Sequence, residues 1–297
     1  MSYRPTRPSR SDHPTVRGLR YHVRHWGDTA LPKLVLAHGW MDIAASWQFL
    51  VDALADDWHM HWHIIAPDWR GFGASEWDPQ GYWFPDYYAD LDALLDHYAP
   101  DQPVNLVGHS MGGNVACIYA GVRPERVAKL ISMEGFGLPA SDPADAPARI
   151  AKWLDEWREA PSLKPYASID ELAARLKSGS PRLSQEQAHF LAEAHAFERG
   201  GRIEFSSDPR HKGSNPIPYR LEEARACWRK VTAPTMWMLG SDSDLVKRFY
   251  GHDGSEVDAR AACFANIRMT VIKNAGHMMH HDQPLAVANV IQDFLRT

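Results

Sequence analysis

The sequence predicts an α/β protein with a mostly parallel central sheet flanked by helices and interrupted by a helical insertion. Short apolar runs alternate along the chain with amphipathic segments of helical length, the pattern of a parallel sheet covered by helices on both faces. Several of these runs are almost entirely apolar, as strands buried on both faces should be. Between residues 138 and 226 the alternation stops and helical spacing takes over, which indicates an insertion.

The individual elements follow from these runs. We predict strands over residues 34–37, 63–67, 104–108, 127–133, 235–239 and 268–272, and an antiparallel entry hairpin around Tyr21 and Val23. We predict helices over residues 46–54, 85–98, 112–121 and 284–295. Within the insertion, one helix face is indicated by apolar residues at i, i+3, i+4 and i+7, namely Ile150, Trp153, Leu154 and Trp157, and similar stripes cover residues 169–176 and 190–197.

These elements divide the chain into three parts. Residues 1–15 alternate arginines with prolines and are expected to form a flexible N-terminal tail. Residues 16–137 and 227–297 form the α/β core, and residues 138–226 form a helical lid or cap. Residues 199–219, rich in Gly, Pro and Ser, predict a long loop that leads back to the core.

The composition argues against several classes of function. The chain has 297 residues, with 32 Lys and Arg against 37 Asp and Glu, so its net charge of −5 gives no broad attraction to nucleic acid. No apolar run approaches the roughly 18 residues of a membrane-spanning helix, and the N-terminal arginines are not followed by the apolar segment of a secretory signal. Cys117, Cys227 and Cys263 are scattered and odd in number, which favours a cytoplasmic location. The oligomeric state is left open.

A candidate nucleophile lies between a predicted buried strand and a predicted helix. The segment Gly108-His109-Ser110-Met111-Gly112 has the pattern Gly-x-Ser-x-Gly in that context. Glycines flank the serine because the sharp turn leaves no room for side chains. Ser110 would be held in strained geometry with its hydroxyl at a helix N-terminus, where developing negative charge is favoured. We therefore predict that Ser110 is a catalytic nucleophile.

The backbone around Ser110 can supply an oxyanion hole. The predicted strand at 34–37 runs into His38-Gly39-Trp40, and we expect His38 to hold this loop by hydrogen bonds. We expect the N–H groups of Trp40 and Met111 to bind the oxyanion, each such donor typically contributing about 10²–10³ in rate. The side chains expected to bind substrate are those of Trp40, His109, Trp153 and Trp157.

The general base is expected near the C-terminus. His277 follows the last predicted strand, on a loop from which a histidine can reach a serine on a central strand, and His280 and His281 follow it closely. Histidine is the side chain whose ordinary pKa suits a general base near neutral pH. Asp242 and Asp244 follow the strand predicted at 235–239, and Glu134 ends the strand predicted at 127–133, so each is positioned to orient His277.

Together these motifs resemble the α/β-hydrolase superfamily, from about Val16 to Leu295. Residues 67–75, Pro-Asp-Trp-Arg-Gly-Phe-Gly-Ala-Ser, look like the superfamily's loop after the strand that precedes the elbow. The insertion is similar to the lid of the subgroup that contains haloalkane dehalogenases, epoxide hydrolases, esterases and C–C bond hydrolases. Residues 240–244 and 134–137 look like those of serine-hydrolase-like proteins in that subgroup.

The resemblance also ranks the three candidate acids. In many relatives the acid lies three residues past a glycine like Gly240, where this chain has Ser243. Ser243-Asp244-Leu245 resembles the acid segment of relatives with a turn one residue longer. The resemblance therefore favours Asp244 as the acid, with Asp242 and Glu134 as alternatives.

The resemblance implies a hydrolase that uses no cofactor. Dehalogenases and epoxide hydrolases have an aspartate at the elbow, whereas Ser110 implies attack on a carbonyl with His277 as base, followed by hydrolysis of an acyl-enzyme. The expected activity is carboxylic-ester hydrolysis of a small-molecule acyl substrate. Thioester, lactone or C–C bond cleavage, a ligand-binding receptor and a catalytically silent scaffold are the alternatives.

One histidine-rich pattern could bind metal. Residues 58–63, Trp-His-Met-His-Trp-His, alternate so that an extended strand would place His59, His61 and His63 on one face. His61 precedes Asp68 by seven residues, about 23 Å in an extended strand, so such a site would lie at the opposite end of the sheet from Ser110. We expect no catalytic metal.

Overall fold

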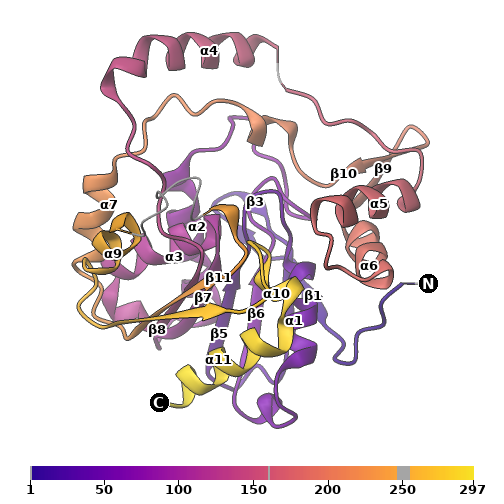
Figure 1. Cartoon of the computed structure of the whole chain (residues 1–297). Coiled ribbons are helices and arrows are strands. Elements are labelled where there is room, and N and C mark those ends of the chain that lie inside the picture. The colour runs from indigo at the N-terminus through magenta and orange to yellow at the C-terminus, as the bar shows by residue number, and fades with distance from the viewer. Residues whose placement is uncertain (1, 160, 246–254) are drawn as a thin grey trace.

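An eight-stranded sheet forms the centre of the protein (Figure 1). The computed structural model describes residues 2–159, 161–245 and 255–297. In spatial order the strands are β1 (Arg10–Asp12), β4 (Val23–Trp26), β6 (His63–Pro67), β5 (Lys33–Ala37), β7 (Val104–His109), β8 (Val127–Met133), β11 (Thr235–Gly240) and β12 (Ile267–Ile272). Strand β4 pairs antiparallel with β1 and β6, and the other neighbours are parallel. The predicted mostly parallel sheet is confirmed.

The six strands predicted for the parallel part are all present, with ends that differ from the prediction by at most one residue. The centre of the sheet explains why apolar runs identified them. Leu106 of β7 lies opposite Val35 of β5 and Leu130 of β8, and all three are buried. A strand with helices on both faces has no solvent side on which a polar residue would be favoured.

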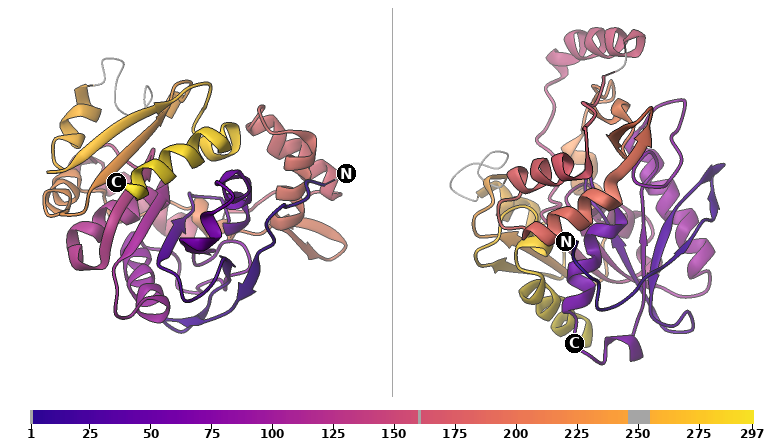
Figure 2. Two further views of the ribbon diagram at one scale, coloured as in Figure 1. Left: turned by 90° about the horizontal axis from the view of Figure 1, so that it is seen from below. Right: turned by 90° about the vertical axis from the view of Figure 1, so that its right-hand side faces the viewer.

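Helices cover both faces of the sheet (Figures 1 and 2). One apolar core contains residues of α2 (Phe84–Tyr98), α3 (Met111–Val122), α7 (Leu221–Trp228) and α9 (Ser255–Ala261). The other contains residues of α1 (Gln48–Ala53), α10 (Met279–Asp282) and α11 (Pro284–Arg296). In the described part of the chain, no helix is both long enough and apolar enough to span a membrane.

Between β8 and α7, the residues that the structure describes include three α-helices and a hairpin. The helices are α4 (Ala146–Arg158), α5 (Ile169–Gly179) and α6 (Gln185–His195), and the hairpin joins β9 (Ala196–Arg199) to β10 (Arg202–Phe205). Helices α5 and α6 share a small apolar core with Phe49 of α1. Helix α4 projects from the body (Figure 2). In the described part of the chain, none of its residues is buried. The hairpin was not predicted, and it takes Phe197 out of the predicted helix.

Two expectations outside the parallel sheet, for residues 1–15 and for residues 58–63, differ from what the structure shows. The expected flexible tail is ordered, because β1 pairs with β4 and Tyr3 packs edge-on against Phe49 while its hydroxyl donates to Asp52 at 2.8 Å. Directly after this segment, a short hairpin joins β2 (Thr15–Val16) to β3 (Leu19–Arg20). The histidine-rich segment is not extended throughout, since residues 58–60 form a 3-10 helix before β6 begins at His63.

Candidate active site

Ser110 occupies a strained turn between β7 and α3. Its φ is +51° and its ψ −114°, a conformation that L residues rarely adopt. The Ser110 N–H donates to the carbonyl oxygen of Met133 at 2.8 Å, which fixes the turn against the end of β8. A Cβ atom at Gly112 would overlap the carbonyl oxygen of Ala37, so the glycine lets α3 begin against the end of β5. The elbow geometry predicted from the Gly-x-Ser-x-Gly pattern is present.

His277 is hydrogen-bonded to a buried carboxylate. It lies after β12, with its side chain 31% exposed, and its Nδ1 donates to Oε2 of Glu134 at 2.7 Å. Glu134 directly follows β8, with φ of +52°, and is buried. Because Nδ1 carries the proton of this hydrogen bond, the other ring nitrogen is left with a lone pair that can accept a proton.

Two further donors hold the Glu134 carboxylate. Oε1 accepts from the backbone N–H of Gly240 at 2.9 Å, and Oε2 also accepts from Oγ of Ser243 at 2.7 Å. Ser243 is the residue three positions past Gly240, where many relatives were expected to carry the acid. Here that position supplies a hydroxyl that donates to a carboxylate from the neighbouring strand.

The carboxylate that bonds His277 in the structure is that of the alternative acid Glu134, so we take Glu134 in place of Asp244 as the candidate acid. Asp244 is exposed, whereas the carboxylate bonded to His277 is that of Glu134. Asp242 points elsewhere, since its Oδ2 lies 2.5 Å from Nη2 of Arg182 and forms an exposed ion pair. Both aspartates follow the strand β11, while Glu134 follows β8, which lies between β7 and β11 in the sheet.

The loop after β5 lies against the nucleophile. A Cβ atom at Gly39 would lie 3.2 Å from Cβ of Ser110, so a glycine allows this close approach. Met41 in the same loop has φ of +58°. Met111 is the first residue of α3, and its N–H is one of the four that an α-helix leaves without an intrahelical acceptor. The loop carrying Trp40 and the start of α3 thus meet beside Ser110.

His38 holds this loop in place, as expected. Its Nδ1 donates to the carbonyl oxygen of Gly39 at 2.7 Å, and its Nε2 accepts from the N–H of Trp69 at 2.9 Å. These two bonds require the neutral ring, and burial lowers the pKa of His38 to about 4. His38 therefore ties the loop after β5 to the loop after β6.

A cavity of about 450 Å³ opens beside the elbow. Met111 and Trp40 line it on the side of α3, and Trp153 and Trp157 of α4 line it on the side of the insertion. The indole N–H of Trp40 donates to the carbonyl oxygen of His211 at 3.2 Å, which links the two sides. Other residues of the lining were not identified from the sequence: Tyr82, Trp83, Phe84, Tyr87, Arg210 and His211 among them.

His109 was expected in this cavity but lies elsewhere. It is 1% exposed, and its Nε2 lies 2.8 Å from the carbonyl oxygen of His277. The side chain of the residue before the nucleophile therefore contacts the loop of the base instead of forming part of the cavity lining.

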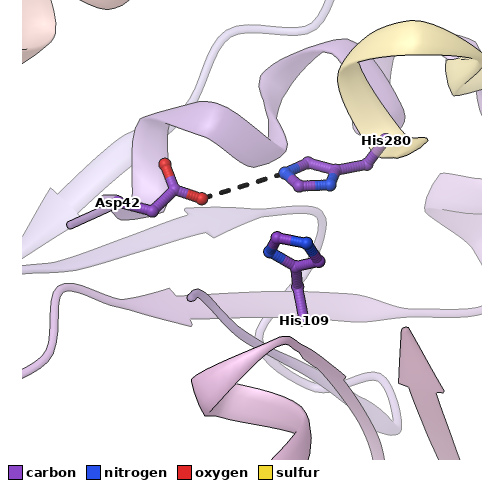
Figure 3. Close-up of side chains that lie close together, drawn as sticks. All are labelled: Asp42, His109 and His280. Atoms are coloured by element: carbon purple, nitrogen blue, oxygen red, sulfur yellow. Dashed lines mark ion pairs between the residues drawn. The ribbon is translucent and has the colours of Figure 1, made fainter. Parts of the chain in front are cut away.

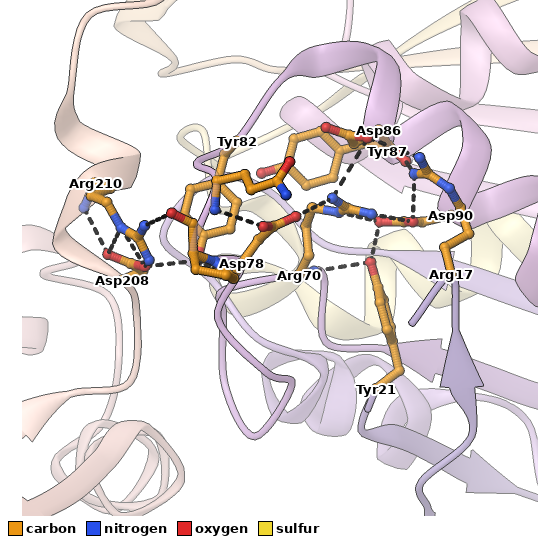
Figure 4. Close-up of polar contacts among 12 residues, drawn as sticks. Arg17, Tyr21, Arg70, Asp78, Tyr82, Asp86, Tyr87, Asp90, Asp208 and Arg210 are labelled. Carbon is orange, nitrogen blue, oxygen red and sulfur yellow. Dashed lines mark hydrogen bonds and ion pairs between the residues drawn. The ribbon is translucent and has the colours of Figure 1, made fainter. Parts of the chain in front are cut away.

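A chain of charged and phenolic groups borders the cavity (Figure 4). Asp90 of α2 is fully buried and accepts from Arg70 at 2.5 and 2.6 Å and from the hydroxyl of Tyr21. Further along, the hydroxyl of Tyr82 donates to Oδ2 of Asp208 at 2.8 Å. The core and the insertion are thus joined by hydrogen bonds on this side of the cavity.

Comparisons with known proteins agree with this architecture. The family described as alpha/beta hydrolase fold matches residues 32–284. A serine hydrolase-like protein of Danio rerio is 28% identical over 279 residues, covering 91% of this chain and 83% of the relative. Epoxide hydrolase 4 of Homo sapiens is 25% identical over 315 residues, covering 97% of this chain and 80% of the relative.

A solved structure gives the same fold. The thioesterase domain from the curacin biosynthetic pathway superposes with a TM-score of 0.83 at 23% identity, covering 96% of this chain and 99% of that domain. The family match extends over most of the chain and includes the turns that carry Ser110 and His277. The chain therefore belongs to the α/β-hydrolase fold family.

Proposed function

We propose that the chain is a serine hydrolase that cleaves a carboxylic ester or a related acyl bond through an acyl-enzyme intermediate. Ser110 is the nucleophile, His277 the general base and Glu134 the acid that orients it. The backbone N–H groups of Trp40 and Met111 stabilise the oxyanion of the tetrahedral intermediate.

The observation that carries this proposal is the hydrogen bond that fixes the proton of His277 on Nδ1, in a chain whose elbow serine has the strained φ of +51°. The bond of 2.7 Å from Nδ1 of His277 to Glu134 leaves Nε2 to accept the proton of the Ser110 hydroxyl. Glu134 also stabilises the imidazolium that forms as the proton moves. When the leaving group departs, His277 returns the proton to it, and water then repeats the sequence on the acyl-enzyme.

The elbow residue supports acyl transfer over epoxide opening. Although epoxide hydrolases are among the relatives, the resemblance to that subgroup implied an aspartate nucleophile, which forms an alkyl ester. Ser110 cannot form that ester, so a carbonyl substrate is the chemistry that fits this residue. The tryptophan-rich cavity supports a small, largely apolar acyl substrate, with the insertion acting as a lid.

Labelling and turnover test this assignment. A fluorophosphonate probe should modify Ser110 of the parent protein, and hydrolysis of p-nitrophenyl esters should fall about 10⁶-fold in Ser110→Ala, on the scale known for subtilisin. Ser241→Ala is the matched control, because it removes an exposed hydroxyl just after the end of β11. That Oγ donates to Asp242 and accepts from the N–H of Asn274. If Ser110→Ala folds and keeps both labelling and turnover, the proposed mechanism is wrong.

A further inference from the structure

Three potential metal ligands lie together in the interior, next to His277 (Figure 3). They are Asp42 of the loop after β5, His109 at the end of β7 and His280 of α10, which are 5%, 1% and 0% exposed. One ligand atom from each lies within 4.8 Å of the others, and Nε2 of His280 is 3.9 Å from Oδ2 of Asp42. A separation of 3.9 Å is too long for a hydrogen bond, so His280 and Asp42 lie close together without being hydrogen-bonded to each other.

The histidine nitrogens of this cluster lack partners. Among the described residues, both ring nitrogens of His280 and Nδ1 of His109 are buried with no hydrogen-bond partner. Nε2 of His109 faces the carbonyl oxygen of His277, an acceptor, so Nε2 carries the proton and Nδ1 keeps its lone pair. Buried polar atoms are normally satisfied, because leaving one unpaired costs about 1–3 kcal/mol. These atoms therefore point to a ligand.

The ligand types identify the class of that ligand. Two imidazoles and a carboxylate are the donors that Zn²⁺ and neighbouring divalent transition metals accept, with bonds of about 2.0–2.2 Å. Ligand atoms around a tetrahedral ion of that size are about 3.3 Å apart, so side-chain shifts of about 1 Å would close the cluster. Two hydrogen bonds support the ligands from outside: Ser46 Oγ donates to Oδ2 of Asp42 at 2.8 Å, and His109 is held by His277.

We propose that Asp42, His109 and His280 form a binding site for Zn²⁺ or a similar divalent transition metal, and that the bound ion inhibits hydrolysis. Binding of the ion depends on these residues alone, while the inhibition rests on the proposed role of His277. His277 lies beside the site: its side chain is partly exposed, and its ring centroid lies 4.6 Å from that of His109.

Inhibition follows from the position of the ion. A bound ion fixes His109, which bonds the backbone carbonyl of His277 at 2.8 Å, and so restrains the base. Because this effect does not involve the tryptophan-lined cavity, the ion should lower kcat more than it changes KM.

Metal binding is measured first and without reference to turnover. Zn²⁺ is titrated into the purified, metal-stripped protein in competition with a chromophoric chelator, and Co²⁺ absorption reports the geometry of the ligands. The parent protein should bind one ion, and His280→Phe should weaken that binding at least tenfold. Phe keeps the ring that packs on Trp47, at a centroid distance of 4.7 Å, but has no ligand atom.

His281→Phe is the matched control. His281 is also buried, and both of its ring nitrogens also lack hydrogen-bond partners in the described chain, yet it is outside the cluster. It should bind Zn²⁺ as the parent does. Asp42→Asn, a change of similar volume that removes the anionic ligand, gives a second measure if His280→Phe does not fold. Unchanged Zn²⁺ affinity in whichever of these two variants folds would overturn the site.

The position of the ion is checked with His277→Ala. This variant should retain Zn²⁺ binding, because His277 is not a ligand in the proposal, and loss of binding would place the ion on the base itself and refute the proposed ligand set. Zn²⁺ should slow ester hydrolysis by the parent and by His281→Phe, reversibly with EDTA, and should affect His280→Phe far less. Binding without inhibition would refute the inhibitory role and leave the ligand set standing.

Discussion

Glu134→Gln tests the proposed acid most directly, because it removes one charge and almost no volume. The carboxylate accepts three hydrogen bonds, from Gly240, Ser243 and His277. An amide has one oxygen, so its NH₂ group must face one of those donors. If it faces His277, the imidazole carries its proton on Nε2, and the base can no longer accept from Ser110.

The magnitude follows from these contacts. In serine proteases, changing the triad aspartate to asparagine imposes the wrong histidine tautomer and lowers kcat by about 10⁴, and we expect a similar loss here. If the amide turns so that its NH₂ faces Gly240, a buried N–H loses its acceptor, at a cost of about 1–3 kcal/mol in the free energy of unfolding. Since Glu134 does not line the cavity, KM should change little.

The assay compares kcat for p-nitrophenyl ester hydrolysis in Glu134→Gln, Asp244→Asn and Asp242→Asn, with folding checked by circular dichroism. The two aspartate variants make the same chemical change at exposed carboxylates and should stay within about twofold of the parent, since an exposed ion pair such as that of Asp242 with Arg182 contributes about 0–1 kcal/mol. If Glu134→Gln keeps turnover within about tenfold while Asp244→Asn loses it, the acid is Asp244 and the assignment to Glu134 is wrong.

Three further predictions concern stability and substrate choice. Asp90→Asn should lower the free energy of unfolding by about 1–3 kcal/mol in urea titration, because it removes the fully buried carboxylate that accepts two hydrogen bonds from Arg70, while Asp78 and Asp86 remain as partners of the guanidinium; a loss below about 0.5 kcal/mol would contradict this. The free energy of unfolding should decrease as the pH is lowered below about 6.5, because the pKa of His38 is about 4 in the folded chain and 6.5 in the unfolded chain, which therefore takes up the proton first. The decrease due to His38 is about 2 kcal/mol at pH 5, and a urea midpoint that does not depend on pH would refute it. Trp153→Ala and Trp157→Ala should change the preference between short and long acyl chains more than they change the fastest kcat, because both side chains line the cavity and neither is buried; equal slowing of every ester would oppose a lid role.

The core of the fold was predictable because burial and backbone sterics leave clear marks in the sequence. Strand β7 is mostly apolar since both of its faces are covered, and the glycines at 108 and 112 are required by carbonyl and Cα atoms that a Cβ would meet. His277 was identifiable because a loop after the last parallel strand ends at the same edge of the sheet as Ser110.

The acid was not predictable in the same way. Asp244 and Glu134 both follow strands that end at this edge, so their order along the chain does not separate them. The choice depends on which side chain enters the interior, and that depends on the positive φ of Glu134 and on the hydroxyl of Ser243. The sequence signal for Glu134 was Ser243, which has a hydroxyl at the position where many relatives were expected to carry the acid.

The β9–β10 hairpin was missed although Gly200 and Gly201, the two residues between its strands, are a local signal of a hairpin. The N-terminal residues were missed for another reason. Their contacts are made with distant parts of the chain, as when Tyr3 packs on Phe49 and Phe190, and local composition does not report such contacts. Arg7 acts similarly, donating to the carbonyl oxygens of Val51 and Leu54 at 2.5 and 2.8 Å.

The exposed setting of α4 has a consequence for how the protein exchanges ligands with solvent. In the described part of the chain, Trp153 and Trp157 of this helix line the cavity, and Glu156 accepts a hydrogen bond from the N–H of Ser214 at 2.5 Å. None of its residues is buried. A helix with so little buried area can detach at a small free energy while the sheet stays folded. Its amide hydrogens should therefore exchange many orders of magnitude faster than those of β7, and the rate at which substrate enters would be set by this local detachment rather than by the width of a fixed channel.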